Sequence, residues 1–250
     1  MIVRRIHASD HREAYDLWAK HFADPALMAN RDAETTRRKL ARVASQLSLG
    51  PASRVLDVGP GDGALFRLVS NRVLRCCGVD PSASAVAKLT RLFRNAPNVE
   101  FRLGSAEDIP YADKSFDVVV INSVLQALPS KAVVEQALAE LVRVCSPGGT
   151  VFVGELPFRP ELDRGIVVHL GRKLREFGPR ALARTIYSTY IRPLLRGEPL
   201  VLYPATNLHV PQEEFEAICS SLGLAVRCLR HLELRRPSET RNDYFLALSS

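Results

Sequence analysis

The sequence lacks long hydrophobic runs. No apolar stretch in its 250 residues approaches the roughly 20 residues that a transmembrane helix needs. The first residues, MIVRRIHASDHREAYDLW, also lack the apolar segment of a secretory signal. These absences predict a cytoplasmic protein that does not span a membrane.

Cysteine pairs are missing as well. The five cysteines include no C-x-x-C pair and no Cys/His cluster at the spacing of metal ligands. We therefore expect reduced, mostly buried thiols and no metal site. The sequence also has no internal repeats and no low-complexity tract, and its 46% hydrophobic residues suffice for one sizeable core.

Acidic residues are outnumbered, with 27 Asp and Glu against 34 Lys and Arg, which gives a formal charge of +7. This excess favours an acidic partner such as a phosphate, nucleic acid or lipid headgroup. Most of it lies in residues 159–196, where apolar residues at helical spacing predict amphipathic helices with basic faces. The nine basic residues there are Arg159, Arg164, Arg172, Lys173, Arg175, Arg180, Arg184, Arg192 and Arg196.

Strand and helix patterns alternate through the middle of the chain. The predicted strands are RVLDVG, VLRCCGVD, VEFRLGS, FDVVVINSV and TVFVGEL, and helical patterns such as SASAVAKLTRLFRNA and KAVVEQALAELVRVC separate them. Such alternation predicts a parallel sheet with right-handed crossovers. LAVRCLRHLEL and DYFLALS are expected to extend this sheet at one edge as a strand pair.

These patterns divide a single predicted domain, residues 1–250, into four segments. They are an N-terminal helical lid (1–50), a core that binds the cofactor (51–155), a basic helical insertion over the substrate (156–211), and a C-terminal helix with the strand pair (212–250).

The strongest chemical signal is the glycine-rich loop after the first core strand. Gly59, Gly61 and Gly63 let the backbone turn sharply and approach a ligand while the next helix points its N-terminus outward. Asp80 ends the following strand, where a carboxylate can accept hydrogen bonds from ribose hydroxyls. The pattern predicts a nucleoside cofactor. With Ala64 it also satisfies G-x-G-x-x-A, so a nicotinamide dinucleotide and a turn without any ligand are the alternatives.

Five segments occur in a familiar order: VLDVGPGDG, GVDPS, GSAEDIPYADKSFDVVV, INSVLQALP and VCSPGGTVFVGE. Over residues 54–155 they resemble the motifs of class I S-adenosylmethionine-dependent methyltransferases. The resemblance implies an α/β fold, a Rossmann-like seven-stranded, mostly parallel sheet of order 3-2-1-4-5-7-6 with an antiparallel C-terminal strand, helices on both faces and a helical cap. It also implies S-adenosyl-L-methionine as cofactor. An acid at the start of the loop suits a donor that carries an ammonium and a sulfonium, and Asp57 occupies that place.

The resemblance further assigns roles by position. Asp57, Gly59, Gly61 and Gly63 would surround the methionine moiety and Asp80 would hold the ribose. Pro81 and Ser82 would border the adenine, the backbone of Ala106 and Glu107 would meet its edge, and Asn122 and Ser123 would line the floor beneath the sulfonium. The family commonly has an acid before that alanine, whereas this chain has Ser105. Its hydroxyl can accept the same bond, and the alternative is that Glu107 or Asp108 substitutes for the acid.

The residues that would bind the methyl acceptor, here called the acceptor side, are less well defined. The candidate bases are His21, His169 and His209, and the candidate substrate contacts are Tyr15, Trp18, Arg172 and Arg175. The sequence INSV differs from the N-P-P-[YF] of amino-group DNA methyltransferases, and there is no Pro-Cys dipeptide for a cytosine mechanism. No recognised RNA-binding module is present. We therefore expect no DNA or RNA substrate.

The sequence thus predicts an enzyme that methylates a small molecule, at a hydroxyl oxygen of a sugar or natural-product scaffold that is anionic or lipid-linked. One alternative is a carbon or nitrogen methyltransferase acting on a quinone-like or lipid acceptor. Another is a module that binds the cofactor and catalyses nothing. Peripheral membrane contact through the basic segment and the choice between a monomer and a homodimer stay open.

Overall fold

The computed structural model describes residues 33–158, 208–230 and 241–248, the short stretches 5–7, 178–187 and 200–202, and the single positions Glu13, Asp16, Leu174, Ile191 and Leu195. The chain divides into two compact units. Unit 1 comprises Met1–Thr36 and Leu162–Thr206, and unit 2 comprises Arg37–Glu161 and Asn207–Ser250.

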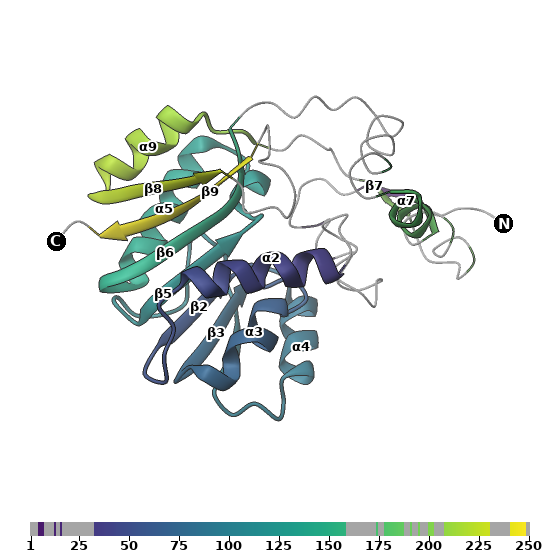
Figure 1. Cartoon of the computed structure of the whole chain (residues 1–250), viewed down its shortest axis with the longest axis horizontal. Coiled ribbons are helices and arrows are strands. Elements are labelled where there is room, and N and C mark those ends of the chain that lie inside the picture. Colours follow the sequence, from purple (N-terminus) through teal and green to yellow (C-terminus); the bar gives the residue numbers. More distant parts are fainter. Residues whose placement is uncertain are drawn as a thin grey trace. The chain divides into compact units, whose positions relative to one another are not determined.

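Unit 2 contains a seven-stranded sheet (Figure 1). Its strands are β2 (Arg54–Val58), β3 (Arg75–Asp80), β4 (Val99–Leu103), β5 (Phe116–Asn122), β6 (Cys145–Pro157), β8 (Leu224–Arg230) and β9 (Arg241–Leu248). Their order is β4-β3-β2-β5-β6-β9-β8, and only β9 runs antiparallel to its neighbours β6 and β8. The predicted order 3-2-1-4-5-7-6 and the predicted fold class are confirmed.

Helices cover both faces of this sheet. Successive side chains of a strand point to opposite faces, so the apolar residues of the strands belong to two separate cores. The helices are α2 (Ala33–Gln46), α3 (Ala64–Val69), α4 (Ala83–Leu92), α5 (Lys131–Val144) and α9 (Gln212–Ser221), with single 3₁₀ turns at Ser70–Arg72 and Leu125–Ala127. On one face Val43 of α2 and Leu65 of α3 share a core with Val120 of β5. On the other, Leu138 of α5 and Phe215 of α9 pack in a second core.

Unit 1 contains a two-stranded parallel pair that the sequence did not predict. β1 (Arg5–His7) pairs with β7 (Leu200–Leu202), and α7 spans Pro179–Ile186. Both strands fall in segments predicted to be helix or loop. Strands of three residues are too short for an alternating pattern to stand out, and their pairing partner is remote in sequence, so local patterns do not report them.

Two smaller features of unit 2 concern Ser82 and the cysteines. Ser82 caps α4, since its hydroxyl accepts a hydrogen bond from the Ala85 N–H at 3.1 Å. All five cysteines are free thiols, and four of them are buried.

Gly63 joins the glycine turn to α3 and offers a test of how tightly this turn is packed. Its φ is +74°, and a Cβ there would lie 2.7 Å from the ring of Phe93. Gly148 has the same φ of +74° with nothing within 4 Å of its Cβ position. We expect Gly63→Ala to lower the free energy of unfolding by about 2–4 kcal/mol, through backbone strain plus overpacking, and Gly148→Ala by only about 1 kcal/mol. Urea unfolding of both variants measures the difference, and equal losses would show that Phe93 moves aside freely.

Candidate functional site

The residues predicted to bind the cofactor gather at one edge of the sheet in unit 2. Asp57, Asp80 and Asn122 lie at the carboxyl ends of three neighbouring strands, β2, β3 and β5. The pairings of Val58 with Val79 and with Ile121 place these ends in register. The carboxyl edge of a parallel sheet, beside the first crossover, is where α/β proteins of this type bind ligands.

Asp57 is the buried acid of this edge. It is 5% exposed and forms no hydrogen bond or ion pair within the described part of the chain. Burial, followed by the nearby charges of Asp62 and Asp80, raises the pKa of the Asp57 carboxyl to about 8. A cationic ligand would stabilise the charged form of this buried carboxyl group.

The turn after Asp57 brings the backbone to the surface. Gly59, Gly61 and Gly63 all have positive φ. The Asp62 carboxylate accepts a hydrogen bond from the Ala64 N–H at 3.0 Å, which fixes the start of α3. A Cβ on Gly61 would meet nothing within 4 Å, so the backbone there is open to a ligand.

Asp80 and the residues after it form the next part of the edge. The Asp80 Oδ1 accepts a hydrogen bond from the Ser82 N–H at 2.9 Å. Pro81 is exposed, whereas Ser82 is buried and its hydroxyl caps α4. Pro81 therefore presents a surface beside Asp80, and the Ser82 hydroxyl is engaged within its helix.

The segment predicted to meet the adenine follows β4. Ser105 and Asp108 are joined by two backbone hydrogen bonds, of 3.2 and 3.3 Å, which close a tight turn. Ala106 points into the core, while Ser105 and Glu107 are half-buried. The turn thus places two polar side chains at the edge, just after β4, the strand that pairs with β3.

The side-chain oxygen of Asn122 is a second hydrogen-bond acceptor at this edge. Its Oδ1 is buried and has no hydrogen-bond partner among the described residues. A Cβ on the neighbouring Gly154 would overlap this oxygen, so the glycine makes room for the amide. Together with Asp57, the orphaned oxygen gives the edge two acceptors that receive no hydrogen bond from the described residues, which fits a cationic ligand better than a pyrophosphate.

Behind Asn122 lies a buried ionic cluster that the sequence did not reveal. Lys39 of α2, 3% exposed, forms an ion pair with Glu155 and lies 3.5 Å from the Asp243 Oδ1. Arg241 Nη1 lies 3.5 Å from the Glu155 Oε2, and the Ser123 hydroxyl donates a hydrogen bond of 2.6 Å to the same oxygen. One signal was present, because Lys39 stands four residues before Val43 on the apolar stripe of its helix.

Of the predicted acceptor-side residues, only His209 lies in the described part of the chain. It is half-buried, and the segment around it is tied to the same edge of the sheet. The Leu208 N–H donates to the Gln126 carbonyl and the Val210 N–H to the Pro157 carbonyl, both at 2.8 Å. The other predicted residues, His21, His169, Tyr15, Trp18, Arg172 and Arg175, lie outside the described residues, and their roles stay predictions.

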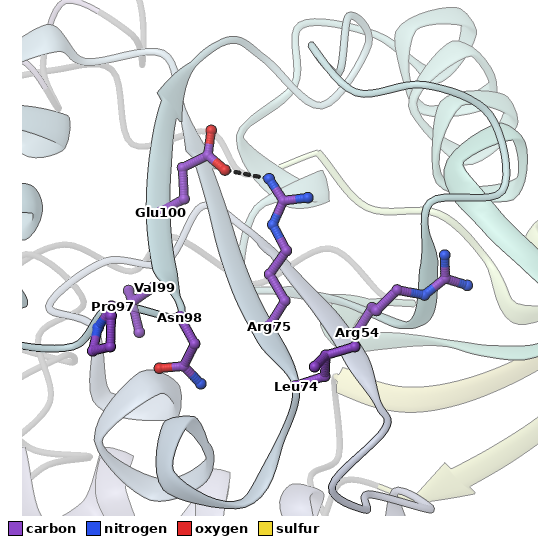
Figure 2. A pocket seen from close by; sticks show the side chains of 7 residues that line it. All are labelled: Arg54, Leu74, Arg75, Pro97, Asn98, Val99 and Glu100. Carbon is purple, nitrogen blue, oxygen red and sulfur yellow. Dashed lines mark hydrogen bonds and ion pairs between the residues drawn. The ribbon is translucent and has the colours of Figure 1, made fainter.

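A surface depression of about 570 Å³ lies at the opposite edge, beside the amino ends of the strands. Its lining residues are Arg54, Leu74, Arg75, Pro97, Asn98, Val99 and Glu100 (Figure 2). Arg75 forms an ion pair with Glu100, and Arg54 pairs with Asp117 at 2.7 Å. Both of its guanidinium groups are therefore already in ion pairs, and the depression is remote from the glycine turn.

Neither a metal cluster nor a membrane-spanning helix is found among the described residues. No group of three or more His, Cys, Asp or Glu side chains there is arranged to hold a metal ion. None of the helices described has the length and apolar character needed to cross a membrane.

Comparison with known proteins gives matches over this same region. Residues 56–153 match the family described as a methyltransferase domain. The chain is 34% identical over 170 residues to a demethylmenaquinone methyltransferase from Renibacterium salmoninarum, covering 66% of this chain and 68% of the relative. It is 30% identical over 170 residues to peramine synthetase A from Epichloe festucae, covering 64% of this chain but only 6% of that longer protein.

A solved structure shares the fold. A SAM-dependent methyltransferase from Leishmania major superposes with a TM-score of 0.64 at 14% sequence identity, covering 94% of this chain and 81% of the other. This likeness concerns the architecture alone, whereas the family match and the relative from Renibacterium salmoninarum concern the sequence. The chain therefore belongs to the class I S-adenosylmethionine-dependent methyltransferases, enzymes whose cofactor is S-adenosyl-L-methionine.

Proposed function

We propose that this protein transfers a methyl group from S-adenosylmethionine to a hydroxyl oxygen of a small molecule, a sugar or natural-product scaffold. The observation that carries the cofactor site is the buried Asp57 carboxylate, to which no described residue offers a cationic partner, beside the open turn at Gly61. Asp57 would pair with the ammonium of the methionine moiety, Asp80 would accept from the ribose hydroxyls, and Asn122 would lie beneath the sulfonium.

The cofactor supplies a methyl group that is already activated. What the chain must add is alignment of the acceptor and, for a hydroxyl, removal of a proton. His209 is the candidate base supported by position, since hydrogen bonds on either side of it tie its segment to Gln126 and Pro157 at the carboxyl edge.

A second candidate is carbon methylation of a quinone-like acceptor. It is favoured by the likeness to the demethylmenaquinone methyltransferase, whose name states a quinone substrate. The basic segment 159–196 would suit an anionic or lipid-linked form of either acceptor. Cytoplasmic location, a monomeric or dimeric state and peripheral membrane contact belong to the same proposal.

The experiment that tests the proposal has two steps. Calorimetry with S-adenosylmethionine and S-adenosylhomocysteine measures cofactor binding, and absence of binding at high micromolar concentration would contradict the cofactor site. Incubation with methyl-labelled cofactor and a panel of hydroxylated scaffolds and reduced quinones, read by mass spectrometry, then locates the methyl group. Label on oxygen supports the first candidate, label on a ring carbon the second, and binding without transfer would favour a module that catalyses nothing.

The ribose contact has its own test. We expect Asp80→Ala to weaken S-adenosylmethionine binding by about 1–3 kcal/mol, because a charged hydrogen-bond acceptor is lost. Asp80→Asn retains the oxygen that accepts from the Ser82 N–H. It should therefore keep the turn while losing the charge, and show a smaller loss. An unchanged dissociation constant for both variants would mean that the ribose is held elsewhere.

A further inference from the structure

The ionic cluster of Lys39, Glu155, Asp243 and Arg241 lies directly behind the segment assigned to the sulfonium. Three of its members are fully or nearly fully buried, at 0–3% exposure. Two acids and two bases lie together here. A buried cluster of charges is sensitive to the loss of any one of them, because the remaining charges act through a low dielectric.

The link from this cluster to the site runs through Ser123. The Ser123 hydroxyl donates to the Glu155 carboxylate at 2.6 Å, and the Ser123 N–H donates to the Gly154 carbonyl at 3.0 Å. Ser123 and Glu155 both have positive φ, at 60° and 62°, which non-glycine residues rarely adopt. Strained residues on adjacent strands persist only where the surroundings enforce them.

Ser123 in turn adjoins the orphaned acceptor. Asn122 Nδ2 lies 3.5 Å from the Ser123 Oγ, and the Asn122 Oδ1 is left without a partner. On its other side the segment meets the glycine turn, because a Cβ on Gly59 would overlap the Val124 side chain. The segment 122–124 is thus held between the ionic cluster and the turn that begins after Asp57.

From this arrangement, and resting on the proposed function, we propose that Glu155 is a positioning residue that acts through Ser123. It holds Asn122 in place and balances the charges of Lys39 and Arg241, so that the site favours the charged sulfonium of S-adenosylmethionine over the neutral thioether of S-adenosylhomocysteine. Neutralising Glu155 removes one negative charge behind the segment. The more positive surroundings oppose a sulfonium and leave a thioether almost unaffected.

The test compares the two ligands, which differ in the sulfonium methyl and its charge. Calorimetry of Glu155→Gln is expected to show about 10-fold weaker binding of S-adenosylmethionine and no more than about 2-fold weaker binding of S-adenosylhomocysteine. A purely structural role would weaken both ligands equally, and that result would overturn the proposal. The matched control is Glu214→Gln, which removes the acid of the half-exposed Lys131–Glu214 pair and should leave the ratio unchanged.

Two further variants keep the test decisive if Glu155→Gln folds poorly. Ser123→Ala removes only the linking hydroxyl and should also lower the preference for S-adenosylmethionine, by about 3- to 10-fold. In the double variant the two effects should be less than additive, since one acts through the other. Strict additivity, or an unchanged ratio in Ser123→Ala, would overturn the link.

If the wild type binds neither ligand, the proposed function itself fails, whereas binding of both with an unchanged ratio in the variants defeats only this inference.

Discussion

Asp57→Asn is expected to weaken S-adenosylmethionine binding by about 2–4 kcal/mol, or roughly 30- to 1000-fold. The carboxylate is 5% exposed, and no described residue offers it a hydrogen bond or an ion pair. The ligand ammonium would supply a cationic partner at a position that is nearly closed to water. Calorimetry at pH 7.5 measures the loss, and retention of wild-type affinity would remove Asp57 from the site.

The same substitution should stabilise the ligand-free protein. The folded pKa of Asp57 is about 8, whereas an unfolded aspartate titrates near 4. Between these two pH values the folded state keeps a proton on Asp57 that the unfolded state has lost. The contribution of Asp57 to the free energy of unfolding is therefore fully present below about pH 4 and is lost as the pH rises through 8. Asparagine cannot ionise, so the Asp57→Asn variant does not lose stability in this way as the pH rises. Its free energy of unfolding should exceed that of the wild type by about 1–3 kcal/mol at pH 8.5, and the two should converge at low pH.

Binding should also release a proton, because pairing with an ammonium returns Asp57 to its charged form. We expect release of nearly one proton per S-adenosylmethionine at pH 6.5, measured by calorimetry in buffers of different ionisation enthalpy. Asp57→Asn should abolish the release. The control is Asp62→Asn, which removes one of the charges that raise the pKa of Asp57. It should bind within about threefold of the wild type and release fewer protons at pH 7.

The order of the sheet could be predicted because each strand of the core carries a local signal. RVLDV and FDVVVIN are apolar on both faces and end where a glycine or a polar residue begins a loop, which identifies buried parallel strands. Asp57, Asp80 and Asn122 follow from the same patterns, since a residue that ends a parallel strand must lie at the shared edge.

The ionic cluster could not be predicted in this way. Lys39 and Asp243 are 204 positions apart, and each sits in a segment whose pattern predicts only a helix or a strand. A lysine on an apolar stripe is more often found with its ammonium reaching solvent. Only the packing of α2 over the carboxyl end of β6 and the amino end of β9 places it between two acids. The position of His209 is equally beyond local patterns, because its segment is held at the edge by backbone hydrogen bonds to Gln126 and Pro157, which are remote in sequence.

Lys39→Met is expected to lower the free energy of unfolding by about 3–5 kcal/mol, because it leaves Glu155 and Asp243 buried without their shared cation. The matched control is Lys131→Met, the same substitution in a pair whose side chains are 43% and 39% exposed, where a loss below about 1 kcal/mol is expected. Urea unfolding measures both.

A second change separates charge from packing at the same position. If the loss in Lys39→Met comes from uncompensated carboxylates, adding Glu155→Gln should restore about 1–2 kcal/mol by removing one of them. If it comes from lost contacts of the lysine stem, the second substitution should destabilise the protein further. Recovery would show that the cluster is maintained by charge balance, the property on which the preference for a sulfonium depends. It would also mean that stability and ligand discrimination share the same four side chains, so neither can be altered there without changing the other.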